Sequence, residues 1–296
     1  KPTATDMQWV FDMSPVDATQ CTFQLDVDLD LDGTPDLRPE YQETAYMIFA
    51  GVSSDAYTPP PGGGAGDTIE YVTIATTGNA LDFGNLTVSR NYSGGTGNNT
   101  RGLFGGGYAS GAKNEIDYIT IATTGNATDF GDLQSARVAH ESGCSNGTRA
   151  IWGGGAIYTP SSVVVDTIGY VTIATTGNAT DFGNLTQARR AAASCSSSTR
   201  GIWFGGYTPT YVNTIDFATI ATTGDATDFG DSIWSGAYRG STSNGTRGIS
   251  VSGRTPSDRS NRIEFVTIAT TGNGADFGDA AVRDGNGSTS DSHGGL

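Results

Sequence analysis

Basic residues are scarce in this chain. Of its 296 residues, 16 are Lys or Arg and 31 are Asp or Glu, which gives a formal net charge of -15 at pH 7. Binding to nucleic-acid backbones or to anionic membrane surfaces requires clustered Lys and Arg. We therefore expect neither as a partner.

Long apolar runs and cysteines are scarce too. No run of 18 apolar residues occurs, so we expect no membrane insertion. The three cysteines, Cys21, Cys144 and Cys195, are odd in number and lack CxxC spacing, which argues against a thiolate zinc cluster and against a disulfide framework. Cys144 and Cys195 occupy the same place in neighbouring repeats, so a bridge between them is an alternative to the commoner small buried thiol.

One phrase, TIATTGN, occurs almost unchanged five times. Successive copies start 47, 52, 47 and 48 residues apart, at Thr73, Thr120, Thr172, Thr219 and Thr267. This period lies in the range of propeller and other array repeats. With 43 glycines and few helix-forming runs, the chain is predicted to be mostly β.

Each repeat resolves into four short segments with turn signals between them, and four antiparallel strands form one propeller blade. In one copy we expect strands at 138–145, 148–152, 167–174 and 182–189. The first segments are poor in bulk, as strands near a propeller axis must be, and the middle ones carry the aromatic residues that fill the space between blades. The first repeat lacks an inner strand and the terminal GNGSTSDS can supply it, which predicts a closed ring of five blades.

Two sets of arginines recur with the repeat. Because a functional site is normally made once, repetition indicates structure, and we expect ion pairs and hydrogen bonds between blades. The arginines are Arg90, Arg137, Arg189 and Arg283, then Arg101, Arg149, Arg200 and Arg247, and the recurring aspartates include Asp82, Asp129, Asp181 and Asp228.

Residues 1–45 stand outside the repeat and are acidic. CTFQLDVDLDL alternates apolar and acidic residues, which is typical of a strand with one dry face. The pattern DxDxDGxxxD follows, and its carboxylates are ligands that Ca²⁺ prefers; they belong to Asp28, Asp30, Asp32 and Asp36. A solvated acidic strand end is the alternative, because the twelfth position of a helix-loop-helix calcium site is Pro39 rather than Glu.

The segments that join second to third strands vary between repeats in length and content. Variable loops on a rigid scaffold are where recognition tends to reside, and tyrosine offers an apolar face with a polar tip. We predict a ligand-binding face for glycans or protein surfaces, although the same tyrosines could merely cap the blades. They are Tyr57, Tyr108, Tyr158, Tyr207 and Tyr211.

The order of features in residues 46–296 resembles the kelch repeat: a glycine pair after an apolar strand, then I-x-[YF], a turn and an AR-like element. The usual tryptophan of the third element is replaced by phenylalanine, at Phe83, Phe130, Phe182, Phe229 and Phe277. The near-identical copies look like the kelch-like repeats of structural proteins and fibres of tailed phages, especially those of marine bacteria. This resemblance implies an all-β, five-bladed propeller at a virion or extracellular surface.

Some kelch propellers carry a copper site built from histidines, tyrosines and a cysteine. Only His140 and His293 occur here, too few for that site, so we expect no enzyme. The expected function is a virion-associated structural and adhesion protein whose residues 1–45 attach to other structural proteins and whose loops bind a host glycan or surface protein. The alternative is a stand-alone, calcium-dependent, lectin-like protein. Apart from Ca²⁺, no cofactor is expected.

Overall fold

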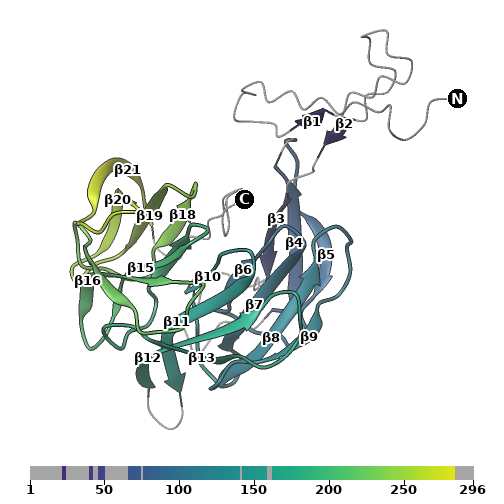
Figure 1. Cartoon of the computed structure of the whole chain (residues 1–296), viewed down its shortest axis with the longest axis horizontal. Helices are drawn as coiled ribbons and strands as arrows, with labels where there is room; N and C mark the ends of the chain where they lie inside the picture. Colours follow the sequence, from purple (N-terminus) through teal and green to yellow (C-terminus); the bar gives the residue numbers. More distant parts are fainter. Residues whose placement is uncertain are drawn as a thin grey trace, which may run out of the picture. The chain divides into compact units, whose positions relative to one another are not determined.

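The computed structural model describes residues 22–24, 40–42, 46–50, 66–74, 76–140, 142–158 and 162–283. Every regular element in these ranges is a β-strand (Figure 1), so the predicted all-β class is confirmed. This part of the chain has no helix long and apolar enough to cross a membrane. Contacts group the chain into two compact units, Lys1–Met47 with Val72–Ala80 and Ile48–Tyr71 with Leu81–Leu296.

A small antiparallel pair lies in the first unit. Strand β1 (Thr22–Gln24) pairs with β2 (Glu40–Gln42), and Phe23 lies opposite Tyr41. The predicted calcium ligands Asp28, Asp30, Asp32 and Asp36 lie outside the described residues. The calcium site therefore stays a prediction, as does the division of the chain at residue 45.

The repeats form separate antiparallel sheets, numbered here in chain order. Sheet 1 has three strands and sheets 2 to 5 have four strands each, in sequential order. The colours of Figure 1 follow this succession. Sheet 1 contains β3 (Tyr46–Ala50), β4 (Thr68–Thr73) and β5 (Leu81–Asn85); sheet 2 contains β6 (Gly94–Gly97), β7 (Arg101–Tyr108), β8 (Ala112–Thr120) and β9 (Thr128–Asp132).

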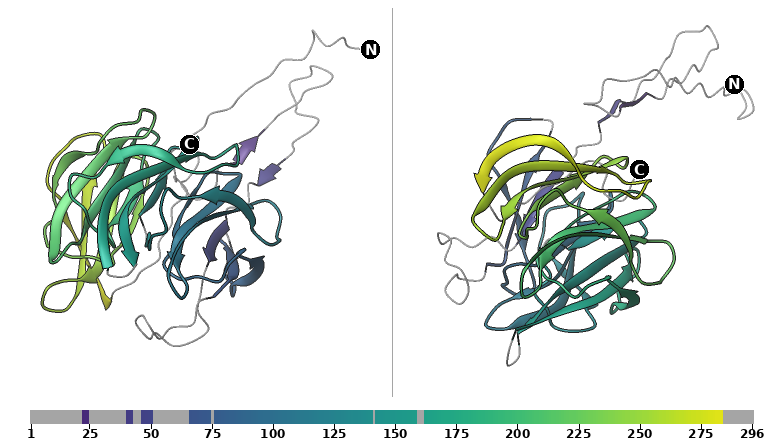
Figure 2. Two further views of the ribbon diagram at one scale, coloured as in Figure 1. Left: turned by 90° about the horizontal axis from the view of Figure 1, so that it is seen from below. Right: turned by 90° about the vertical axis from the view of Figure 1, so that its left-hand side faces the viewer.

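The later sheets repeat this plan, and the two views of Figure 2 show their twist. Sheet 3 contains β10 (Gly143–Ser145), β11 (Arg149–Tyr158), β12 (Ser162–Thr172) and β13 (Thr180–Asn184). Sheet 4 contains β14 (Ala193–Ser196), β15 (Arg200–Tyr207), β16 (Tyr211–Thr219) and β17 (Thr227–Asp231). Sheet 5 contains β18 (Gly240–Ser243), β19 (Arg247–Arg254), β20 (Arg259–Thr267) and β21 (Ala275–Arg283).

Four strands per repeat were correctly predicted, but several bounds were wrong. In sheet 3 the second strand runs on to Tyr158, beyond its predicted end at residue 152, and the fourth ends at Asn184 instead of residue 189. In the four later repeats, part of the predicted variable loop is therefore hairpin strand, as where Tyr207 pairs directly with Tyr211. Closure of the sheets into a five-bladed ring also stays a prediction.

The repeated glycine pair forms a bulge that also contacts the next sheet. The register of β7 against β8 shifts between Gly105 and Gly107, and Gly106 has a φ of 65°. A Cβ on Gly106 would lie 2.6 Å from the carbonyl oxygen of Arg137. The same oxygen accepts a hydrogen bond of 2.9 Å from Gly107 N–H. Only glycine permits both the conformation and this close approach.

The first strands of sheets 2 to 5 lie side by side and are built from small residues, as predicted. Serine hydroxyls connect them across the sheets: Ser194 Oγ donates to Gly143 O at 2.9 Å, and Ser241 Oγ donates to Ser194 O at 2.6 Å. A bulky side chain at these positions would separate the strands.

Tryptophans fill the space between sheets. Trp152 and Trp203 are fully buried, and the Nε1–H of Trp152 donates a 2.9 Å hydrogen bond to Gly94 O in the preceding sheet. A Cβ on Gly105 would lie 2.9 Å from the Trp152 ring, so the glycine of one sheet makes room for the tryptophan of the next. This confirms the predicted role of these aromatic residues.

The repeated phrase TIATTGN connects each of sheets 2 to 5 to the sheet before it. The last four residues of a copy, such as Thr123–Asn126, cross to the preceding sheet, and we call this segment the latch. In the latch of sheet 2, Gly125 N–H donates to Phe83 O at 2.7 Å, and Asn126 Oδ1 accepts from Asn85 N–H at 3.1 Å. The same backbone hydrogen bond recurs between Gly177 and Phe130, Gly224 and Phe182, and Gly272 and Phe229.

Sheet 5 differs in what covers its last strand. Phe277 is 52% exposed, whereas Phe83, Phe130, Phe182 and Phe229 are at most 4% exposed. A Cβ on Gly278 would meet nothing within 4 Å, although its counterparts would collide with a latch glycine. None of the latches of sheets 2 to 5 lies over this strand.

Candidate functional site

The buried arginines hold each sheet together. Arg90 pairs with Asp117 at 3.0 Å, Arg189 with Asp216 at 2.9 Å and Arg239 with Glu264 at 2.7 Å, all side chains being fully buried. The acid lies on the third strand of the sheet that the arginine precedes. The aspartates that we expected as partners, such as Asp82 and Asp228, are exposed and form none of these pairs, so that prediction was wrong.

In sheet 3 the acidic position is Gly169, and Arg137 is buried without a carboxylate partner in the described part of the chain. Its Nη1 donates to Thr167 O at 2.8 Å and its Nη2 donates to Trp152 O at 3.2 Å. Burial lowers the pKa of Arg137 to about 10. Gln134 occupies the room beside Gly169, since its Oε1 lies 2.7 Å from where a Cβ would be.

The second arginine set connects neighbouring sheets, as predicted. Arg101 lies with its Cζ 4.7 Å from the centroid of the Tyr118 ring, and its Nη1 donates to Ile173 O of the next sheet at 2.8 Å. Arg149 and Arg200 make the same pair of contacts one and two sheets further along. These arginines are structural.

Cys144 and Cys195 are both buried and free, so they are not bridged. Burial raises the pKa of the Cys195 thiol to about 12, and burial together with Cys195 raises that of Cys144 well above its usual value. Each sulfur packs against a glycine of the next sheet. The role of a small buried thiol is confirmed.

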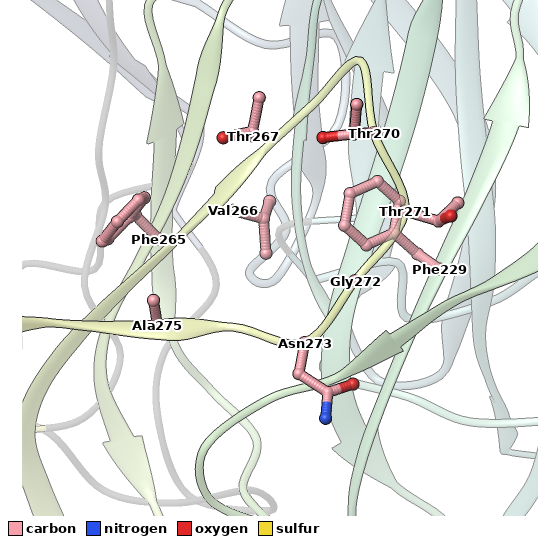
Figure 3. A pocket seen from close by; sticks show the side chains of 9 residues that line it. All are labelled: Phe229, Phe265, Val266, Thr267, Thr270, Thr271, Gly272, Asn273 and Ala275. Atoms are coloured by element: carbon pink, nitrogen blue, oxygen red, sulfur yellow. The ribbon is translucent and has the colours of Figure 1, made fainter.

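A pocket of ≈ 170 Å³ lies at the last copy of the repeated phrase (Figure 3). Threonines and Asn273 of the latch line it, together with Phe229 of the preceding sheet, which lies beside Thr271 in the figure. Because the residue types are those of every other latch, this pocket belongs to the junction between sheets and indicates no separate site.

Four of the predicted tyrosines form two ring contacts at the ends of the hairpins that join second to third strands. The Tyr108 and Tyr158 ring centroids are 5.7 Å apart, and those of Tyr207 and Tyr211 are 5.1 Å apart. Arg190 connects the two pairs: its Nη1 donates to Tyr158 Oη, and its Cζ lies 5.0 Å from the centroid of Tyr207. Tyr57 lies outside the described residues. Ligand binding by this group stays a prediction.

A second group lies just before the first strands. Tyr92, His140, Ala191 and Tyr238 occupy equivalent places in sheets 2 to 5, and all are left-handed, with φ of 58°, 48°, 53° and 56°. His140 N–H donates to Tyr92 O at 2.9 Å, and Tyr238 N–H donates to Ala191 O at 3.1 Å. The conformation is thus a repeated feature, whereas the side chain at it differs from sheet to sheet.

The side chains of this second group form a cluster around His140. Its ring centroid lies 5.1 Å from that of Tyr92 and 5.4 Å from that of Tyr238. His140 is 8% exposed, and its Nε2 is buried without a hydrogen-bond partner.

Electrostatics connect this cluster to the tyrosines. Burial, and then the charge of Arg190, lower the pKa of His140 to about 3. Burial raises the pKa of Tyr238, with Tyr158 and Tyr211 adding to the rise and Arg190 and Arg254 opposing it. The charge of Arg190 therefore acts on both side chains. In the described residues it forms no ion pair.

Sequence reasoning missed Tyr92, Arg190 and Tyr238, and it treated His140 as an ordinary inner-strand residue. A signal was present: the segments NYSGG, AHESGC, RAAASC and AYRGSTS are small except within their first three residues. A bulky residue that breaks a run of small ones marks a position with its own role.

Comparison with protein families and with curated proteins gives no match. No protein-family model matches this chain, and no curated protein matches it significantly. Among the described residues no group of three or more His, Cys, Asp or Glu side chains could hold a metal ion. The residues that remain without a structural explanation are the arginine–tyrosine group and the cluster around His140.

Proposed function

We propose that this chain is a non-enzymatic structural and adhesion protein at the surface of a virion, built as a five-bladed, kelch-like propeller. The observation that supports it most is the contrast between repeated and unrepeated chemistry. Repeated arginines, tryptophans, glycines and latches are used in contacts within and between sheets, whereas Arg190 and His140 stand at places that the other described sheets fill with different residues. A rigid scaffold with one variable face is suited to recognition.

Residues 1–45 would attach the propeller to other structural proteins of the particle, and the hairpin face would bind a host glycan or surface protein. Immunogold electron microscopy tests this on tailed-phage particles whose genomes encode the sequence. We expect antibodies against the chain to label the particle surface. Unlabelled particles, with the chain present only in the surrounding medium, would overturn the assignment.

The second candidate is a stand-alone, calcium-dependent, lectin-like protein, favoured by the DxDxDG pattern of residues 28–33. The two differ in their response to chelation. Fluorescently labelled chain should bind to host cells equally well with and without EDTA if it is the virion adhesin without a calcium requirement, and only without EDTA if it is this lectin.

Ring closure has its own test. In a closed ring the copy of the phrase at 73–79 would act as the latch for Phe277. The Asn178 side chain of another latch accepts a hydrogen bond from Asp132 N–H at 3.0 Å. If the ring is closed, Asn79→Ala should therefore destabilise the chain as much as Asn178→Ala, and urea unfolding of both variants measures the two losses. A loss at Asn178 with none at Asn79 contradicts closure.

A further inference from the structure

We propose that the cluster of Tyr92, His140, Arg190 and Tyr238 binds a sugar that carries a carboxylate. This inference rests on the proposed recognition function and goes beyond it, because it names both the residues and the class of ligand. It also moves the site from the hairpin tyrosines to the residues that precede the first strands.

The first argument is the chemistry of His140. A side chain more than nine-tenths buried normally has its polar atoms satisfied, yet Nε2 has no partner. An imidazole with a pKa of about 3 is neutral at pH 7, so it neither repels Arg190 nor loses a lone pair to a proton. A ligand hydroxyl group could donate to Nε2, and that hydrogen bond would remove the cost of the unsatisfied atom.

The second argument is the flanking rings. Tyr92 and Tyr238 lie on either side of His140, at 5.1 Å and 5.4 Å between centroids, and both are partly exposed. Flat aromatic faces beside hydrogen-bonding groups suit a sugar ring, which presents apolar C–H faces and hydroxyl edges. Among the described aromatic contacts, these two are the ones that a histidine makes.

The third argument is charge. Arg190 has a fixed position because its Nη1 donates to Tyr158 and its guanidinium stacks on Tyr207. Its Nε is buried without an acceptor, and no described carboxylate pairs with it. The groups that shift the pKa of Tyr238 are arginines and tyrosines, with no carboxylate among them. Among the described residues of a chain of net charge -15, this is a local cationic site, and a planar guanidinium is suited to a carboxylate.

The test is titration calorimetry of the full chain with D-glucuronic acid and with D-glucose as probes. We expect glucuronic acid to bind about tenfold more tightly than glucose, because a hydrogen bond to a charged group contributes that much. Arg190→Gln should abolish this preference, and Arg190→Lys should keep part of it. His140→Phe, which keeps a ring and removes the acceptor, should weaken both sugars about tenfold.

Arg247→Gln is the matched control, since Arg247 also stacks on an aromatic ring, at 4.7 Å from Phe265, but lies outside the cluster. It should leave both affinities unchanged. Equal affinity for the two sugars, or affinities that Arg190→Gln and His140→Phe do not change, would overturn the inference. So would the lack of binding by either sugar; particle labelling and cell attachment would then show separately whether the proposed function survives.

Discussion

Removing the carboxylate of Asp216 should destabilise sheet 4 severely. The side chain is fully buried, accepts hydrogen bonds from Thr186 N–H at 3.0 Å and Thr186 Oγ1–H at 2.6 Å, and forms an ion pair with Arg189 Nη2 at 2.9 Å. In Asp216→Ala both donors lose their acceptor, and the Arg189 guanidinium stays buried without this carboxylate. Breaking a buried pair by removing one partner costs about 3–5 kcal/mol.

Urea unfolding followed by tryptophan fluorescence measures this loss. Asp231→Ala is the control, because Asp231 is an exposed aspartate at the end of β17 in the same sheet, and surface substitutions change stability by less than about 0.5 kcal/mol. A loss below about 1 kcal/mol in Asp216→Ala, or one equal to that of the control, would refute the view that these pairs hold the sheets together.

Three further predictions follow from the same contacts. Gly169→Asp with Gln134→Thr rebuilds in sheet 3 the pair of Asp216 and Arg189, and it should raise the urea midpoint; an unchanged or lower midpoint would mean that Arg137 needs no carboxylate. The folded pKa of His140, about 3, lies below its unfolded value of about 6.5, so stability is lost as pH falls below 6.5; at pH 5 the loss is about 2 kcal/mol, and His140→Gln should lack it. The buried thiols Cys144 and Cys195 should not react with a thiol reagent at pH 8 until the chain unfolds, and rapid labelling of the native protein would contradict their burial.

Much of the fold could be predicted from the sequence because each structural feature of the repeat occurs several times in the chain. Small first strands, tryptophans opposite glycines and an invariant phrase are visible without an alignment, and each proved to be a contact between sheets. The ends of strands were less predictable: a glycine pair is typical of a loop, yet Gly106 and Gly107 form a bulge inside a strand.

The candidate site was harder to predict for two physical reasons. Tyrosine, histidine and alanine do not favour a positive φ, so nothing in their type indicates that Tyr92, His140 and Tyr238 are left-handed and converge. The partner of a buried arginine depends on tertiary register, so Asp117 could not be chosen over Asp82 from spacing. The sequence does show one bulky residue, such as His140, at the start of a run of small residues.

The latch has a consequence for how the gene can change. Each junction between sheets uses the same hydrogen bonds, from a latch glycine to the phenylalanine carbonyl of the sheet before it. Unequal recombination between nearly identical coding repeats would therefore add or delete whole sheets and leave every remaining junction chemically intact. Related proteins should therefore differ in length by multiples of about one repeat. Residues that deviate from the repeat consensus, such as His140, would have to arise again by mutation after each such change.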